Sequence, residues 1–186
     1  MSSGAIGRFR DLLPSIEADG AVNIGESYET IMAAAEAGDI RATLLAAYAA
    51  GIGYGRTIDL SAALRLLAAA VERGDEDARA QMNVLKNGGE DVDLGAWIAA
   101  RPTRVVNETP LISMADGFLD ASLCAWLIRR GAPLQEPAFV YDPKTGQAAR
   151  DDLRSNSSGA FKLTDLDLPL ILVRHRIANT IGVPVE

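Results

Sequence analysis

Two similar ten-residue stretches constrain this sequence most: AAAEAGDIRA at 33–42 and AAVERGDEDA at 69–78. Sliding the first copy onto the second pairs Gly38 with Gly74, an offset of 36 residues. A fixed period of this size, with helical patterning around a Gly-Asp step, is typical of a repeated two-helix unit. The sequence therefore predicts a helical solenoid, and its repeat signature comprises Gly38, Asp39, Ala42, Gly74, Asp75 and Ala78.

Each part of the repeat has a physical reason. Glycine readily adopts the left-handed conformation that ends a helix, and an aspartate that follows can cap the next helix. Alanines let paired helices approach closely, while larger side chains fill the space between them. We expect this packing from Leu44, Leu45, Tyr48, Leu64, Leu66 and Leu67.

The stretch YAAGIGYGRTID at 48–59 is predicted to link one unit to the next, with Asp59 as the cap of the following helix. Its three glycines suggest a nucleotide-binding loop at first sight. They follow a helical stretch and not a strand, however, so we interpret them as a turn between repeats.

Bulk composition limits the partners and the compartment. The 186 residues carry 18 basic and 25 acidic side chains, a net charge of −7, so we expect no nucleic-acid partner. No stretch is long enough to cross a bilayer, and we expect no membrane partner. The single cysteine, Cys124, cannot form an internal disulfide, which favours a cytoplasmic location.

The alanine-rich pattern ends near Arg101 and Pro102, and short apolar runs separated by turn residues follow. We therefore predict a helical repeat domain at 1–102 and a second segment at 103–186. In that segment we expect a helix from near Asp120 to Gly131 and a strand within PAFVYDPKTGQ that leads into a turn and a return segment.

These helices have predicted buried faces. The helix that starts near Asp120 should pack Leu123, Trp126 and Leu127 inward. A long last helix should begin after a cap at Asp167, with Pro169 just inside its start. One face of this last helix is expected to carry Leu170, Val173, Ile177 and Ile181.

Two family resemblances follow from these motifs. The run AAYAAGIGYGRTIDLSAALRLLAAAVERGDEDARAQM resembles Sel1-like repeats, which are related to the tetratricopeptide architecture. The succession DGFLDASLCAWLI, PAFVYDPKTG, RSNSSGAF and RIANTIGVPVE resembles the amino-terminal section of prolyl 4-hydroxylase-like oxygenases. Bacterial members of that family are similar in carrying Sel1-type repeats ahead of the oxygenase domain.

The second resemblance implies a jelly-roll (double-stranded β-helix) domain that uses Fe(II) and 2-oxoglutarate, with two histidines and one carboxylate on the iron. In the family, these ligands come after the segment that RIANTIGVPVE matches. The sequence has one histidine, His175, without an Asp two residues later, and we interpret it as a helix-surface residue. We therefore assign no catalytic residue, no metal ligand and no cofactor to this chain, and expect the second segment to be truncated before the iron-binding motif.

The resemblance implies only peripheral contacts. In a complete enzyme, the substrate-side candidates would be Arg154, Ser155 and Asn156, with Tyr141 and Asp142 as further candidates. Other reactive side chains have structural interpretations. We expect Cys124 to be a small packing residue, Asp165 and Asp167 to be helix-start residues, and Asp151 and Asp152 to be solvated loop charges.

Together these features predict an α+β fold that is mainly α: a Sel1-like solenoid followed by an incomplete jelly-roll segment with supporting helices. The preferred functional hypothesis is the amino-terminal portion of a prolyl 4-hydroxylase-like dioxygenase, catalytically silent as given. The alternative is a stand-alone protein-protein interaction module. We expect a protein partner on the repeats and self-association through the incomplete sheet, whose edges and apolar faces would be exposed.

Overall fold

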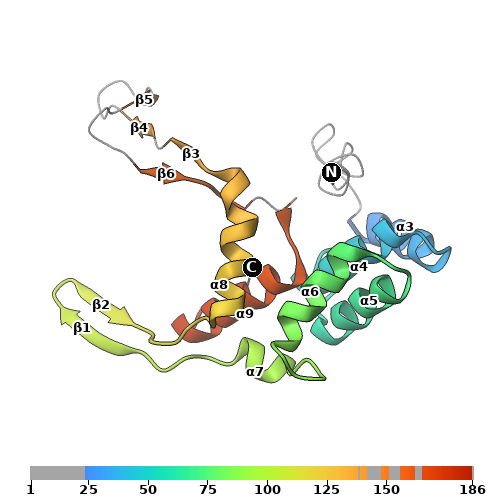
Figure 1. The fold of residues 1–186 in the computed structure, drawn as a ribbon, viewed down its shortest axis with the longest axis horizontal. Coiled ribbons are helices and arrows are strands. Elements are labelled where there is room, and N and C mark those ends of the chain that lie inside the picture. The colour runs from blue at the N-terminus through green and yellow to red at the C-terminus, as the bar shows by residue number, and fades with distance from the viewer. Residues whose placement is uncertain (1–23, 138, 142–147, 151–155, 162–164, 186) are drawn as a thin grey trace.

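The fold is mainly helical with small antiparallel strand pairs, an α+β arrangement. The structure, a computed structural model, describes residues 24–137, 139–141, 148–150, 156–161 and 165–185 (Figure 1). Predicted residues Asp142, Asp151, Asp152, Arg154 and Ser155 lie outside these ranges. Among the helices in these ranges, none is long and apolar enough to cross a membrane.

Four helices carry the sequence repeat: α3 (Ile24–Glu36), α4 (Ile40–Ile52), α5 (Leu60–Glu72) and α6 (Glu76–Lys86). Helices α3 and α5 start at residues 24 and 60, and helices α4 and α6 at residues 40 and 76, so both shifts equal 36. Each helix packs against the next one along the chain. The period read from the sequence therefore corresponds to two successive helix pairs.

The predicted capping roles within the repeat are confirmed. Gly38 and Gly74 have φ angles of 98° and 89°, in the left-handed region that favours glycine. The Asp39 carboxylate accepts hydrogen bonds from the backbone N–H groups of residues 41 and 42, and Asp75 accepts one from residue 78. Asp59 caps α5 as expected, accepting from the N–H of residue 62.

The link between the repeats is shorter than predicted, because α4 continues to Ile52. Gly51 lies inside this helix, and a Cβ atom there would lie 3.1 Å from the Ile171 side chain. Gly51 is thus a point of close helix contact. The turn begins at Gly53, which ends the helix with a φ angle of 79°.

Three further α-helices follow: α7 (Leu94–Ile98), α8 (Ala121–Gly131) and α9 (Leu168–Ile181), with a 3-10 turn at Ala132–Leu134 after α8. Asp120 and Asp167 cap α8 and α9, as predicted. Leu123 and Trp126 are buried, also as predicted, while Leu127 is partly buried against the core.

The predicted inner face of α9 is wrong in part. Ile177 and Ile181 are exposed, whereas Ile171, Leu172 and Val173 are buried. The prediction assumed one apolar stripe, but α9 contacts α4, α5, α6 and α7, so a broader face of it is covered.

His175 corrects another expectation, because it is not a surface residue. Only 6% of it is exposed, and its Nε2 atom lies 3.0 Å from the carbonyl oxygen of Gly51 in α4. Cys124 shows the reverse difference, since it was expected to be buried. It lies in α8, as predicted, but is exposed instead of packed, because α8 turns Leu123 and Trp126 toward the core.

The strands form antiparallel pairs of two. Strand β1 (Arg104–Glu108) pairs with β2 (Leu111–Met114), β3 (Glu136–Pro137) with β6 (Ser157–Ser158), and β4 (Phe139–Tyr141) with β5 (Ala148–Arg150). Figure 1 shows the β1–β2 hairpin and the strands after α8 extending away from the helices. The predicted strand and return segment are present as β4 and β5, and the jelly roll stays a prediction.

One hydrophobic core joins both parts of the sequence. It includes Ala63, Leu67 and Leu85 from the repeat helices, and Leu123 and Ile171 from α8 and α9. Packing therefore crosses the composition change near residue 102, and α9 is held directly on the repeat.

Candidate functional site

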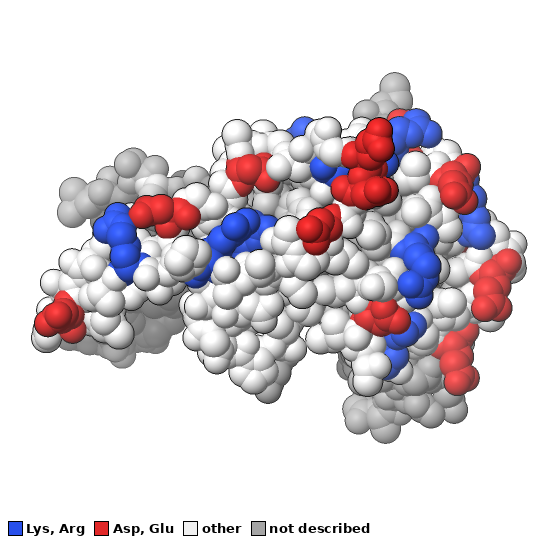
Figure 2. Space-filling model, turned by 90° about the horizontal axis from the view of Figure 1, so that it is seen from below, with Lys and Arg blue, Asp and Glu red and all other residues white. Residues whose placement is uncertain are grey.

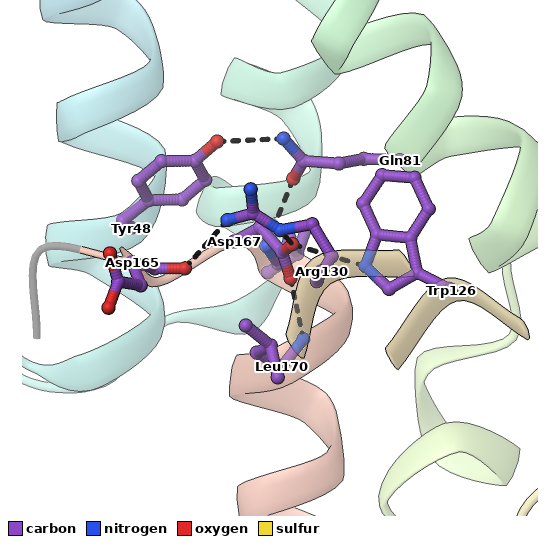
Figure 3. A network of polar contacts seen from close by, with 8 residues as sticks. Tyr48, Gln81, Trp126, Arg130, Asp165, Asp167 and Leu170 are labelled. Carbon is purple, nitrogen blue, oxygen red and sulfur yellow. Dashed lines mark hydrogen bonds and ion pairs between the residues drawn. The ribbon is translucent and has the colours of Figure 1, made fainter. Parts of the chain in front are cut away.

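A network of buried polar contacts lies where α8 and the start of α9 meet the repeat helices, and we call it the α8–α9 junction (Figure 3). At its centre, the Asp167 side chain accepts three hydrogen bonds. Its Oδ1 atom accepts from the Leu170 N–H at 2.8 Å, and its Oδ2 atom accepts from Trp126 Nε1 at 3.1 Å and Arg130 Nε at 3.0 Å. One carboxylate thus caps α9 and ties it to α8.

Arg130 strengthens the same connection. Besides its ion pair with Asp167, its Nη2 atom donates to the backbone carbonyl oxygen of Asp165 at 2.8 Å. Asp165 itself is buried and precedes the cap by two residues. The guanidinium therefore fixes both the carboxylate and the chain that leads into the helix.

A second part of the junction reaches into the repeat. Gln81 of α6 donates from Nε2 to the Tyr48 hydroxyl of α4 at 2.8 Å, and its Oε1 atom accepts from the Leu168 N–H at 3.0 Å. The amide of Gln81 is buried, and both of its ends have partners. The first turn of α9 is therefore attached to two repeat helices.

Burial governs the electrostatics of the junction. It raises the pKa of Asp167 above its ordinary value, although the hydrogen bonds from Leu170, Trp126 and Arg130 act in the opposite direction. Burial also raises the pKa of the Tyr48 phenol above its ordinary value. The junction is shielded from water, so the loss of any one of its hydrogen bonds would lower the free energy of unfolding.

The other end of α9 has its own buried cation. Arg176 donates to the carbonyl oxygens of Trp97 at 2.6 Å, Phe118 at 2.8 Å and Ala96 at 3.3 Å. Its guanidinium also lies 5.4 Å from the centroid of the Trp97 ring. Burial lowers the pKa of Arg176, and the nearby Arg101 lowers it further. These contacts fasten α9 to α7.

The junction is suited to holding elements together. The Asp167 carboxylate is surrounded by donors from the backbone, an indole and a guanidinium, which are groups that fix a charge in place. Among the described residues, no three His, Cys, Asp or Glu side chains gather where they could hold a metal ion. Because the contacts of Asp167 and Gln81 link α8, α9 and the repeat helices, we interpret the α8–α9 junction as a structural joint.

Two of the sequence-predicted substrate-side residues, Tyr141 and Asn156, lie in the described strand segment after α8. Tyr141 ends β4, opposite Ala148 of β5, and Asn156 is exposed just before β6. Asp142, Arg154 and Ser155 fall outside the described ranges.

Sequence reasoning missed the polar residues that attach α9 to its neighbours: Gln81, Trp126 as a hydrogen-bond donor, Arg130 and Arg176. Gln81 and Arg130 lie in helices whose other side chains face either the core or the solvent. No local sequence pattern distinguishes these two residues as contacts between helices. Arg176 follows Arg174 and His175 in the run VRHRIA, so no local pattern distinguishes it from the other polar residues of that helix.

Surface charge is mixed on the face that Figure 2 shows, where basic and acidic side chains are interspersed. A phosphate backbone is attracted to a patch of basic residues, which this face does not present.

Comparison with known proteins gives no family for this chain: no family model, curated protein or solved structure matches it.

Proposed function

We propose that this chain is the amino-terminal portion of a prolyl 4-hydroxylase-like dioxygenase, in which Sel1-like repeats brace the oxygenase segment. The observation that supports bracing is the position of α9, which shares one core with α4, α5, α6 and α7. A helix attached at both ends by buried polar contacts can hold the strands before it at a fixed place on the repeat.

The residues present do not fit the family's iron centre. The single histidine, His175, is enclosed between α9 and α4, with its Nε2 atom on the Gly51 carbonyl oxygen. One histidine cannot supply a triad that needs two. The role proposed for the chain as given is therefore structural, and no catalytic step is assigned to it.

The substrate-side assignments belong to the same proposal. Asn156 and Tyr141 lie on or next to the strands that follow α8, together with Arg154, Ser155 and Asp142 in the sequence. In a complete relative, this strand segment would face the substrate, and the repeats would hold it in place.

Metal and co-substrate binding test this proposal. Anaerobic titration calorimetry should show no tight Fe(II) or 2-oxoglutarate binding by the chain as given. The same titration on a chain extended with its encoded continuation should show both. An extended chain that binds neither, or a gene without a His-x-Asp motif and a distant histidine, would overturn the oxygenase proposal.

A stand-alone interaction module is the second candidate, and a specific observation favours it. Both strands of the β1–β2 hairpin are exposed along their whole length, including several large apolar side chains. If the chain is such a module, a purified partner should protect amides of the repeats or of this hairpin from hydrogen exchange without any added continuation. A chain in which neither segment gains protection would contradict the module.

A further inference from the structure

The β1–β2 hairpin carries the densest group of exposed apolar side chains among the described residues. It extends away from the helical core (Figure 1). Isolated two-stranded hairpins are marginal in water, and an apolar one gains stability when its edge is paired. The exposed apolar residues are Val105, Val106, Leu111, Ile112 and Met114, with Leu111 the most exposed at 72%.

The two edges of the hairpin differ in how well they are protected. In β1 the pairing register shifts at Val106, which is the extra residue of a β-bulge. This strand also carries Arg104 and Glu108, and Arg104 Nε forms an ion pair with Asp116 at 2.8 Å. Bulges and charged side chains are the usual means of blocking an edge. Strand β2, Leu111–Met114, has no bulge, charge or proline.

The bulge also removes a possible ion-pair complementarity between two copies of β1. Arg104 lies opposite Met114, and Glu108 lies opposite Leu111. Met114 and Leu111 are three residues apart on β2 and so point to opposite faces of the hairpin. Arg104 and Glu108 therefore point to opposite faces too, and two antiparallel copies of β1 could not exchange ion pairs between them.

Strand β2 is self-complementary in an antiparallel arrangement. With Ser113 on a two-fold axis perpendicular to the sheet, Ile112 of one copy lies opposite Met114 of the partner subunit. These two residues share a face, as directly opposed residues of an antiparallel pair must. The same symmetry repeats the contact, because a two-fold interface uses one surface twice.

The charges fit this register. On the face with Ile112 and Met114, the neighbours across the hairpin are Asn107 and Arg104. In a paired sheet the four apolar side chains would lie at the centre, with these polar groups at the rim and no like charges opposed. An apolar centre with a polar rim is the composition expected of a protein interface.

We propose that the free edge of β2 pairs with β2 of a second copy, forming a four-stranded antiparallel sheet in the order β1, β2, β2, β1. The occupant is a second copy because the antiparallel register places the exposed apolar side chains Ile112 and Met114 of one β2 opposite those of the other, with no charge at the centre of the contact. The pairing satisfies an edge that the fold otherwise leaves open.

Sedimentation measures this association on the full chain. The wild-type protein should show a concentration-dependent dimer, and Ile112→Lys should raise its dissociation constant by at least about tenfold, because the lysine would lie at the apolar centre. Ile128→Lys is the matched control, since Ile128 is 71% exposed on α8 and outside the proposed interface. Circular dichroism of each variant should match that of the wild type.

Cross-linking tests the register. In a Cys124→Ser background, Ser113→Cys should form a disulfide-linked dimer under mild oxidation, because the two copies of residue 113 lie opposite each other. Glu108→Cys on the blocked strand should form no disulfide-linked dimer under the same conditions, because the two copies of β1 lie at opposite edges of the proposed sheet. A wild-type protein that sediments as a monomer at every concentration, or a dimer that Ile112→Lys leaves intact, would overturn the proposal.

Discussion

At the scale of single residues, two aspartates have the same local role in different surroundings. Asp120 and Asp167 each cap a helix by accepting from the N–H three residues later. Asp167 is buried, and burial raises its pKa. Burial of Asp120 is slight, so the N–H of Leu123 and the Ser122 hydroxyl outweigh it and hold its pKa below the ordinary 3.8.

The two caps should therefore respond to pH with opposite signs. A raised pKa means that the folded state binds the proton more tightly than the unfolded chain. The contribution of Asp167 to the free energy of unfolding should then fall as the pH rises from 3.8 through its folded pKa, and stay constant above it. The contribution of Asp120 should be fully present above 3.8 and be lost as the pH falls through its lowered folded pKa.

Urea unfolding at several pH values, on wild type, Asp167→Asn and Asp120→Asn, measures both contributions as differences. Asparagine is a suitable replacement because it caps helices about as well as aspartate. If the difference in the free energy of unfolding between wild type and Asp167→Asn instead grew with pH, the hydrogen bonds of Asp167 would outweigh the effect of its burial on the pKa.

At the scale of elements, α9 offers two isoleucines of opposite exposure. Ile171 is fully buried against the repeat, near Gly51 of α4, whereas Ile177 is 45% exposed. Ile171→Ala should lower the free energy of unfolding by about 2–5 kcal/mol, because it removes packed atoms and leaves a cavity.

Ile177→Ala on the same helix should change stability by less than about 0.5 kcal/mol, as surface substitutions do. Both values come from urea denaturation followed by tryptophan fluorescence. Equal losses for the two variants would show that α9 does not pack on the repeat in the orientation described.

At the scale of the whole molecule, the shared core predicts cooperative unfolding across the composition change. Trp97 lies in α7 and Trp126 in α8, and they are the two tryptophans of the sequence. Single-tryptophan variants, Trp97→Phe and Trp126→Phe, report on each position in turn. After allowance for the stability change in each variant, fluorescence and far-ultraviolet circular dichroism should give coincident transitions.

A fluorescence transition of Trp126 that clearly preceded or followed the loss of helical signal would indicate two separate folding units. The buried links from Gln81 to Leu168 and from Arg176 to Trp97 are the contacts that such a result would contradict.

The sequence by itself determined the local features of this protein. The 36-residue period, the left-handed glycines and the aspartate caps depend on groups within a few residues of one another, so the pattern of Gly38 and Asp39 was enough to predict them. The helices at 121–131 and 168–181 were predictable for the same reason. The strand at 139–141 was located by its turn residues.

Only the tertiary structure decided what those elements contact. His175, Gln81 and Arg176 are polar residues whose burial depends on helices 79 to 124 positions away in the sequence. No local pattern encodes such partners, because a buried polar group is stable only when a distant segment supplies its hydrogen bond. The position of α9 on the repeat therefore depends on the folded chain. The same holds for the α8–α9 junction, which attaches the strand-bearing segment to the repeat.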